Sequence, residues 1–197
     1  MIAIIDYGAG NISSVKKALE HVAPKAQIQV TNDPEVIAQA EKLVMPGVGH
    51  FCRCQSLDSK IGSAVLEAIS SGIPFLGICV GMQWLFEGST EAPETQGAAL
   101  FAGRCSQFSA EVKSPHVGWN KICLRCDSRL LRGIENGSFV YYTHSFRAPV
   151  IEETAACTHY GGYFSAVVER GNVFGAQFHP EKSGAAGLRI LENFCAI

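Results

Sequence analysis

A cysteine between two glycines is the residue whose surroundings point most directly to chemistry. Cys79 lies in the segment Gly77-Ile78-Cys79-Val80-Gly81, directly after an apolar run. This G-x-C-x-G pattern is the cysteine version of the G-x-S-x-G nucleophile elbow, in which a strand turns sharply into a helix. The glycines remove Cβ atoms where strand and helix come close, and the helix N-terminus favours a thiolate. The pattern predicts a nucleophile at the carboxyl end of a strand; the alternative is a buried structural cysteine.

A thiol nucleophile needs a base, and the sequence offers one with its own orienting group. His179-Pro180-Glu181 follows the apolar run Val173–Phe178, which has the composition of a strand. Because proline disfavours helix in the residue before it, we expect an extended tripeptide. Residues i and i+2 of an extended segment point to the same side, so the Glu181 carboxylate would hold one tautomer of His179 and stabilise its charged form. A surface loop is the alternative for the tripeptide alone; beside Cys79 the catalytic interpretation is favoured.

Attack on a carbonyl also requires hydrogen-bond donors for the oxyanion, and two backbone segments could supply them. The N–H of Val80 follows the nucleophile directly, as it does in other elbows. The loop Pro46-Gly47-Val48-Gly49 ends an apolar strand, and its N–H groups can face an anion; an ordinary strand-to-helix connection is the alternative. We expect the N–H of Val80 and one N–H from the Gly47–Gly49 loop to form the oxyanion hole of a site for acyl transfer from an amide or ester.

A sheet must position these residues, and the first half of the chain has the pattern of a parallel one. Short apolar runs alternate with segments in which apolar residues recur at helical spacing. Alternating strands and helices imply a parallel sheet that is covered on both faces. The expected strands are Met1–Asp6, Gln27–Val30, Lys42–Met45 and Ile73–Ile78, and the expected helices cover 12–22, a short segment from Asp33 onward, and 57–69.

The second half of the chain changes rhythm, because short strand candidates follow one another closely. Gly161-Gly162 and Gly171-Asn172 between them are hairpin signals. We expect an antiparallel extension of the sheet and a closing helix after Ser183, within one domain that spans residues 1–197. The strand candidates are Arg104–Phe108, Val117–Leu124, Phe139–Thr143, Ala155–Tyr160, Tyr163–Glu169 and Val173–Phe178.

Composition narrows the class of protein. The chain has 197 residues, of which 47% are hydrophobic and 17% charged, so we expect a folded globular protein. Its net charge of −2 gives no electrostatic reason to expect nucleic acid or an anionic membrane as a partner. No apolar run approaches the ~20 residues of a membrane span, and no signal peptide is apparent. We expect a cytoplasmic protein whose cysteines are mostly reduced thiols; Cys123 and Cys126 have metal-ligand spacing but lack a second pair.

Two other functions fit part of the sequence. Gly8-Ala9-Gly10 after the first strand could be a phosphate loop, either of a dinucleotide site or of a flavodoxin-like binding module. Ser13 stands where the dinucleotide fingerprint needs a third glycine, and neither interpretation explains the Cys79 elbow or His179-Pro180-Glu181. A free-standing cysteine hydrolase would use the same three side chains without any partner.

Together these segments resemble the class I, or triad, glutamine amidotransferase family. The family's elbow motif G-[IV]-C-x-G-x-Q matches Gly77–Gln83, and its later His-Pro-Glu matches 179–181. More narrowly, the chain resembles the glutaminase subunits of imidazole glycerol phosphate synthase. The segments that carry this narrower resemblance are Asp6–Asn11, Pro46–Gly49, Pro115–Asn120 and His179–Ser183. The resemblance covers the whole chain and implies a flavodoxin-like class I glutaminase fold, a three-layer open α/β sheet that is mostly parallel with an antiparallel extension.

The resemblance also implies an activity. Glutamine would be the substrate: Cys79 attacks its side-chain amide, His179 protonates the departing ammonia, and water hydrolyses the glutamyl thioester. No cofactor and no metal are expected. The residues that the resemblance places against glutamine are Gly47, Gly49, Gln83, His144 and Ser145.

The resemblance further implies a partner. In the family, ammonia passes to a separate (β/α)₈ cyclase subunit that makes imidazole glycerol phosphate and an aminoimidazole carboxamide ribotide in histidine biosynthesis. By resemblance, the oxyanion loop at Val48 would be incompletely formed without that liganded partner. Two features depart from the family pattern: 50–54 replaces small and acidic residues, and Phe146 replaces a frequent tyrosine. The face assigned to the partner is the one around Asn11, Trp119, Tyr141 and Lys182, although Trp119 could be core and Lys182 a solvated charge.

Overall fold

The computed structural model describes residues 1–57 and 59–197, and its central feature is an eight-stranded sheet. The strand order is β2-β1-β3-β4-β13-β12-β11-β8, in which β2 to β13 run parallel and the last three strands are antiparallel to their neighbours. The prediction of a mostly parallel sheet with an antiparallel extension is confirmed. The strands are β1 (Ile2–Ile5), β2 (Ile28–Thr31), β3 (Lys42–Gly47), β4 (Phe75–Cys79), β8 (Cys123–Leu124), β11 (Thr154–His159), β12 (Tyr163–Arg170) and β13 (Val173–Ala176).

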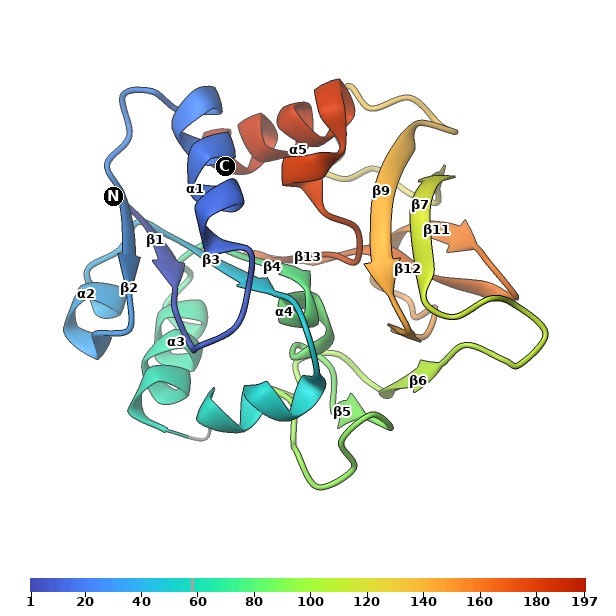
Figure 1. The fold of residues 1–197 in the computed structure, drawn as a ribbon. Coiled ribbons are helices and arrows are strands. Elements are labelled where there is room, and N and C mark those ends of the chain that lie inside the picture. Colours follow the sequence, from blue (N-terminus) through green and yellow to red (C-terminus); the bar gives the residue numbers. More distant parts are fainter. Residues whose placement is uncertain (58) are drawn as a thin grey trace.

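Helices cover both faces of the parallel part and complete three layers (Figure 1). On one face α1 (Ile12–Val22) packs beside the closing helix α5 (Gly184–Ala196). On the other face α2 (Pro34–Ala38) packs beside α3 (Lys60–Ser70). The ends marked N and C lie on the same side of the molecule in Figure 1.

Local sequence signals explain where these helices begin. The Asp33 side chain accepts a hydrogen bond from the N–H of Glu35, and Pro34 takes the first helical position of α2. Helix α3 begins at Lys60, where Ser59 caps it, so the helix expected from residue 57 starts later. Leu57 instead ends a 3₁₀ helix, η1 (Phe51–Leu57), which buries Phe51 and Leu57 against the core.

Strand β13 joins the two parts of the sheet. It pairs antiparallel with β12 on one side and parallel with β4 on the other, where Ala176 lies opposite Ile78. The strand was expected within the antiparallel extension, and its parallel pairing decides the position of the site. Because β4 and β13 run the same way, Cys79 and the residues that follow Ala176 leave the sheet at the same edge.

The remaining strands form two small sheets. Strands β7 (His116–Lys121) and β9 (Phe139–His144) form an antiparallel pair, and β5 (Gly88–Ser89), β6 (Arg104–Gln107) and β10 (Phe146–Arg147) form another sheet. The single strand expected over Val117–Leu124 is therefore wrong. The fully buried Ile122 lies between β7 and β8, and only Cys123 and Leu124 pair with β11 in the central sheet.

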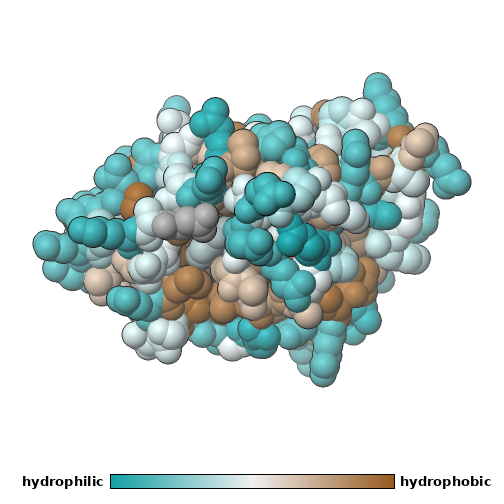
Figure 2. Space-filling view, turned by 90° about the horizontal axis from the view of Figure 1, so that it is seen from below, coloured by the Kyte–Doolittle hydropathy of each residue, from teal (hydrophilic) through white to brown (hydrophobic). Residues whose placement is uncertain are grey.

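The surface is largely polar over the face in Figure 2, where hydrophobic residues gather mainly in a band along one edge. Among residues 1–57 and 59–197, no helix has the length and apolar character needed to cross a membrane.

Candidate active site

Cys79 ends β4 and turns directly into a short helix, α4 (Val80–Gln83). Its backbone has φ 55° and ψ −109°, a conformation that residues other than glycine rarely adopt. Such strain persists only where the surroundings impose it, and nucleophile elbows are one such place. The predicted strand–turn–helix is therefore present, although α4 is only one turn long and its dipole is correspondingly small.

Glycines allow this turn because backbone groups meet there. A Cβ on Gly77 would overlap the carbonyl oxygen of Gly81, and a Cβ on Gly81 would overlap that of Met45. A Cβ on Gly47 would lie 2.5 Å from the Tyr7 hydroxyl oxygen and 2.7 Å from the Gly81 nitrogen. At Gly77 and Gly81 the obstructing atoms belong to the backbone, so no side-chain movement can make room for a Cβ there.

His179 is held by its backbone as well as by its side chain. Its N–H donates to the Tyr141 carbonyl of β9 at 2.9 Å, and its carbonyl accepts from the Ser183 hydroxyl at 2.6 Å. The Ser183 oxygen in turn accepts from the Tyr141 N–H at 3.0 Å. The base is therefore tied to both strand β9 and the start of α5.

Glu181 reaches His179 by a different route from the one expected. Pro180–Lys182 form a 3₁₀ turn, η2, with Lys182 N–H donating to the His179 carbonyl, so the tripeptide is not extended. Proline restricts only the residue before it, and His179 alone keeps the extended conformation. Within this turn His179 Nδ1 and Glu181 Oε1 lie 2.8 Å apart, and both side chains are almost completely buried.

The electrostatics of this pair favour a charged imidazole. Burial opposes the charged form of His179, but interactions with the Cys79 sulfur and the Glu181 carboxylate outweigh it and raise the His179 pKa to about 10. Glu181 occupies Nδ1, while the buried Nε2 makes no hydrogen bond to the described residues. Nε2 is therefore the nitrogen that can exchange a proton with the thiol.

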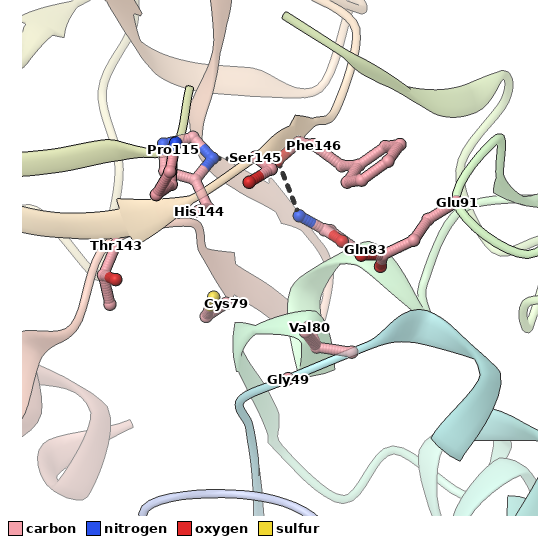
Figure 3. Close-up of a pocket in the computed structure, with 10 residues that line it drawn as sticks. All are labelled: Gly49, Cys79, Val80, Gln83, Glu91, Pro115, Thr143, His144, Ser145 and Phe146. Atoms are coloured by element: carbon pink, nitrogen blue, oxygen red, sulfur yellow. Dashed lines mark hydrogen bonds between the residues drawn. The ribbon is translucent and has the colours of Figure 1, made fainter. Parts of the chain in front are cut away.

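A cavity of about 270 Å³ opens over the thiol (Figure 3). Gln83 and Glu91 approach from one side, and the His144–Phe146 segment lies across from α4. The residues that line the cavity are Gly49, Cys79, Val80, Gln83, Glu91, Pro115, Thr143, His144, Ser145 and Phe146. Four of the five residues assigned to glutamine by resemblance are among them.

The comparisons with known proteins agree with this geometry. The family model for class I glutamine amidotransferases matches residues 3–197. The chain belongs to the class I glutamine amidotransferases. Two curated relatives are named imidazole glycerol phosphate synthase subunit HisH: one from Methanosarcina barkeri is 47% identical, covering 98% of this chain and 96% of the relative. The other, from Salinibacter ruber, is 44% identical, and the match covers 100% of this chain and 94% of that relative.

Solved structures show the same fold. A crystal structure titled glutamine amidotransferase superposes with a TM-score of 0.76 at 16% identity, over 100% of both chains. The structure of PurLQS from Thermotoga maritima superposes with a TM-score of 0.73 at 18% identity, over 99% of this chain and 97% of that one. The predicted family and fold of this amidotransferase are confirmed.

Hydrogen bonds fix the orientation of Gln83 in the amidotransferase. Its Nε2 donates to the Phe146 carbonyl at 2.9 Å and to Gln177 Oε1 at 3.1 Å. Both N–H bonds are thereby used, so the Oε1 atom is the polar group left for a ligand. Glu91, which no sequence motif indicated, adds a carboxylate to the same side of the cavity.

The residues of the predicted oxyanion loop, Gly47–Gly49, face different parts of the molecule. Gly49 lines the cavity over Cys79, whereas Gly47 packs behind the elbow against Tyr7 and Val80. Val48 lines a neighbouring cavity of about 480 Å³, together with Gly49, Asp6 and Arg53. The loop thus separates two cavities, and a role for Val48 in the oxyanion hole stays a prediction.

Three of the four residues assigned to the partner face lie together. Trp119 and Tyr141 are register partners in β7 and β9 with ring centroids 6.0 Å apart, and Lys182 Nζ lies 5.9 Å from the Tyr141 ring centroid. Trp119 is 54% exposed, so it is not a core residue. Asn11 directly precedes α1, which packs against η2.

Gln177 is a further residue that the sequence did not reveal. It follows β13, is fully buried, and its Nε2 lies 3.8 Å from the Cys79 sulfur. Its Oε1 meanwhile accepts from Gln83. The only available signal was a polar residue near the end of the expected strand Val173–Phe178, two positions before His179.

Proposed function

We propose that this chain is the glutaminase subunit of an imidazole glycerol phosphate synthase and hydrolyses glutamine to glutamate and ammonia. The observation that carries the proposal is the 2.8 Å contact between His179 and Glu181, buried at the sheet edge where the strained elbow presents Cys79. The names of the relatives support the same function at more than 40% identity over nearly the whole chain.

The first half of the reaction forms a thioester. The Cys79 sulfur attacks the side-chain amide carbon of glutamine, and the thiol proton passes to His179 Nε2. The tetrahedral intermediate collapses as the imidazolium returns that proton to the amide nitrogen, and ammonia leaves. Glu181 stabilises the imidazolium and holds Nδ1, which agrees with the raised pKa of His179.

The second half reverses these roles with water. His179 takes a proton from a water molecule, the resulting hydroxide attacks the thioester carbon, and the Cys79 sulfur leaves and recovers the proton. Glutamate is released and the site is restored. Both halves pass through an oxyanion that needs hydrogen-bond donors.

Val80 N–H is one donor for that oxyanion. Val80 is the first residue of α4, so its N–H is not used by the helix's own bonding pattern. The second donor comes from the Gly47–Gly49 loop, which we assign to Val48. One such donor contributes roughly 3–4 kcal/mol to lowering the barrier in comparable enzymes.

Glutamine is oriented by acceptors at the far end of the cavity. Gln83 Oε1 and the Glu91 carboxylate are both acceptors, so they suit the α-ammonium group of an amino acid. His144, Ser145 and Gly49 line the remaining walls and would contact the α-carboxylate and the side-chain amide. With its α-ammonium group held there, glutamine would extend its side-chain amide toward Cys79, which lines the same cavity.

The partner is a (β/α)₈ cyclase subunit that receives the ammonia. Val117, Trp119 and Phe139 are more than half exposed on the β7–β9 pair, and such exposed apolar side chains mark an interaction surface. Tyr141 of that pair carries the carbonyl that fixes His179. Docking on this face therefore acts directly on the strand that positions the base.

A glutaminase assay tests the proposal. Wild type and Cys79→Ala would be assayed alone and with the cyclase subunit and its ribonucleotide ligand, by measuring ammonia and glutamate. We expect activity with the liganded partner and a loss of roughly 10⁴-fold or more in Cys79→Ala. Full activity of the lone chain would favour a free-standing hydrolase, and activity in Cys79→Ala would exclude the elbow mechanism.

A further inference from the structure

A buried pair of histidines outside the catalytic triad connects strand β7 to the glutamine cavity. His116 and His144 lie opposite each other in the β7–β9 pair, and both are less than 8% exposed. His116 Nδ1 and His144 Nε2 are 3.0 Å apart. In the reaction proposed above neither ring transfers a proton, and His144 only lines the glutamine cavity, so the hydrogen bonds of this pair need another explanation.

The outer end of the pair fixes the tautomer of His116. The Asn120 amide oxygen accepts from the Lys121 N–H at 2.8 Å, and its nitrogen donates to the His159 carbonyl at 3.2 Å. That nitrogen also lies 3.3 Å from His116 Nε2, and an amide nitrogen can only donate. His116 must therefore accept at Nε2 and carry its proton on Nδ1.

The inner end fixes the tautomer of His144 independently. His144 Nδ1 lies 2.8 Å from the Phe146 carbonyl, which can only accept, so the proton is on Nδ1. His144 Nε2 is then an acceptor, as the Nδ1–H of His116 requires. Two unrelated ends of the chain of bonds thus require the same direction: Asn120 to His116 to His144 to Phe146.

Burial keeps both rings in this neutral arrangement. Burial lowers the pKa of His116 to about 4 and that of His144 to about 3; for His144 the Phe146 carbonyl opposes this shift, while His116, His179 and Arg147 add to it. The His116 ring is stacked between Tyr142 and Tyr160, with centroids 4.8 Å and 4.0 Å away. Ring rotation is thereby restricted as well as ring charge.

We propose that His116 is a positioning residue for the glutamine site, acting through His144 and the Phe146 carbonyl on the Gln83 amide. The Phe146 carbonyl receives both His144 Nδ1–H and Gln83 Nε2–H, so its position depends on the histidine pair. The Gln83 amide also bonds to Gln177, whose own Nε2 lies against the Cys79 sulfur. The inference rests on the proposed function only in naming glutamine as the ligand.

Nitrogen NMR of the free chain tests the first step without any activity. We expect both His116 and His144 as neutral Nδ1–H tautomers at pH 7, whereas a free histidine side chain in water favours the Nε2–H form. An Nε2–H tautomer or a charged ring at either position would overturn the inference. This result is independent of whether the complex hydrolyses glutamine.

Two amide variants test the second step. In His116→Asn the amide nitrogen can take the place of Nδ1 and still donate to His144, whereas in His116→Gln the amide reaches the place of Nε2 and loses that donor. We expect KM for glutamine in the liganded complex to rise about tenfold in His116→Gln and less than about threefold in His116→Asn, with kcat changed less than about threefold in both.

The exposed His159→Gln serves as the matched control, for which we expect wild-type KM. Equal KM values in the two His116 variants would overturn the inference, because ring volume and not the donor would then matter. If either variant fails to fold, the NMR tautomers of His116 and His144 in the wild-type chain decide whether the inference stands. A wild-type complex without glutaminase activity would instead contradict the proposed function and leave the tautomer result standing.

Discussion

Two sides of the site around Cys79 are built in opposite ways. The first, which we call the elbow wall, consists of Cys79 with its flanking glycines and the His179–Glu181 turn. There a Cβ on Gly81 would overlap the Met45 carbonyl oxygen, and the backbone of His179 is bonded to Tyr141 and Ser183. Its geometry is fixed largely by contacts of main-chain atoms, with the Ser183 hydroxyl as a side-chain donor.

The second, which we call the loop wall, is Gly47–Gly49 with the η1 segment that follows. A Cβ on Gly49 would meet nothing within 4 Å, although its φ of +96° favours glycine. The segment after it is held by side chains: Arg53 Nη1 donates to the Gly8 carbonyl at 3.1 Å, and the Glu91 carboxylate accepts from the Phe51 N–H at 2.8 Å. The nucleophile and base are thus held largely through main-chain groups, whereas the loop to which we assign the second oxyanion donor is held largely by side chains.

The largest effect on activity is expected from Glu181, the charged side chain of the elbow wall that contacts His179. In Glu181→Gln the amide can donate to His179 Nδ1, which would shift the ring proton to Nε2 and remove the base that accepts the thiol proton. We expect kcat for glutamine hydrolysis to fall roughly 10²–10⁴-fold, with the fold retained because the side chains are nearly isosteric. Steady-state kinetics of the complex measures this.

Glu192→Gln is the matched control for that substitution. Glu192 lies on the exposed surface of α5 and pairs with Arg189 at 3.3 Å, so we expect wild-type kcat. A fall in kcat of less than about threefold in Glu181→Gln would mean that Glu181 is structural. The charge of the elbow wall would then not contribute to catalysis.

The second prediction contrasts one glycine from each wall. Gly81→Ala places a methyl group on a main-chain carbonyl that cannot move aside, and we expect about 3 kcal/mol of lost stability. Gly49→Ala meets open space and costs only its left-handed conformation, about 1 kcal/mol. Urea unfolding of the two variants measures the difference, and equal losses would mean that the walls do not differ in packing.

The elbow wall was predictable because its signals are local. Glycines on both sides of Cys79 permit the close contact between strand and helix that an elbow requires, and the sequence alone therefore predicted the turn. The same local reasoning failed for the extended His179–Glu181 tripeptide, since Pro180 restrains His179 but leaves Glu181 free to enter a 3₁₀ turn. The His179–Glu181 contact forms nevertheless, because both an extended segment and a 3₁₀ turn bring the two side chains within hydrogen-bonding distance.

Other parts of the site depend on pairing between distant segments. Strand β13 had to be inserted beside β4 for His179 to reach Cys79, and no local pattern distinguishes a parallel from an antiparallel neighbour. The His116–His144 pair forms because β7 and β9 pair with each other in a separate sheet outside the central one. Glu91 belongs to a polar loop without a motif, and only the folded chain brings its carboxylate to the cavity.

The third prediction measures the strain stored at the elbow. Cys79→Gly and Cys79→Ala both remove the thiol, but only glycine adopts φ 55° and ψ −109° without steric cost. We expect Cys79→Gly to be more stable than Cys79→Ala by about 1 kcal/mol, against the usual disadvantage of glycine. Thermal and urea unfolding of the two inactive variants would show the reverse order if the elbow were relaxed.

The smallest effect is expected from a tether of the loop wall. Arg53→Ala removes one hydrogen bond from an exposed side chain to the Gly8 carbonyl, so stability should fall by less than about 1 kcal/mol. The freed segment adjoins Gly49, and we expect kcat to fall about threefold because the oxyanion donor is held less firmly. Arg189→Ala, which loses only a surface ion pair, is the control with unchanged kcat. On the elbow wall, a substitution such as Gly81→Ala should lower stability most. On the loop wall, Arg53→Ala should lower kcat more than stability. If Arg53→Ala lost stability but kept its full kcat, the loop wall would be a structural element like the elbow.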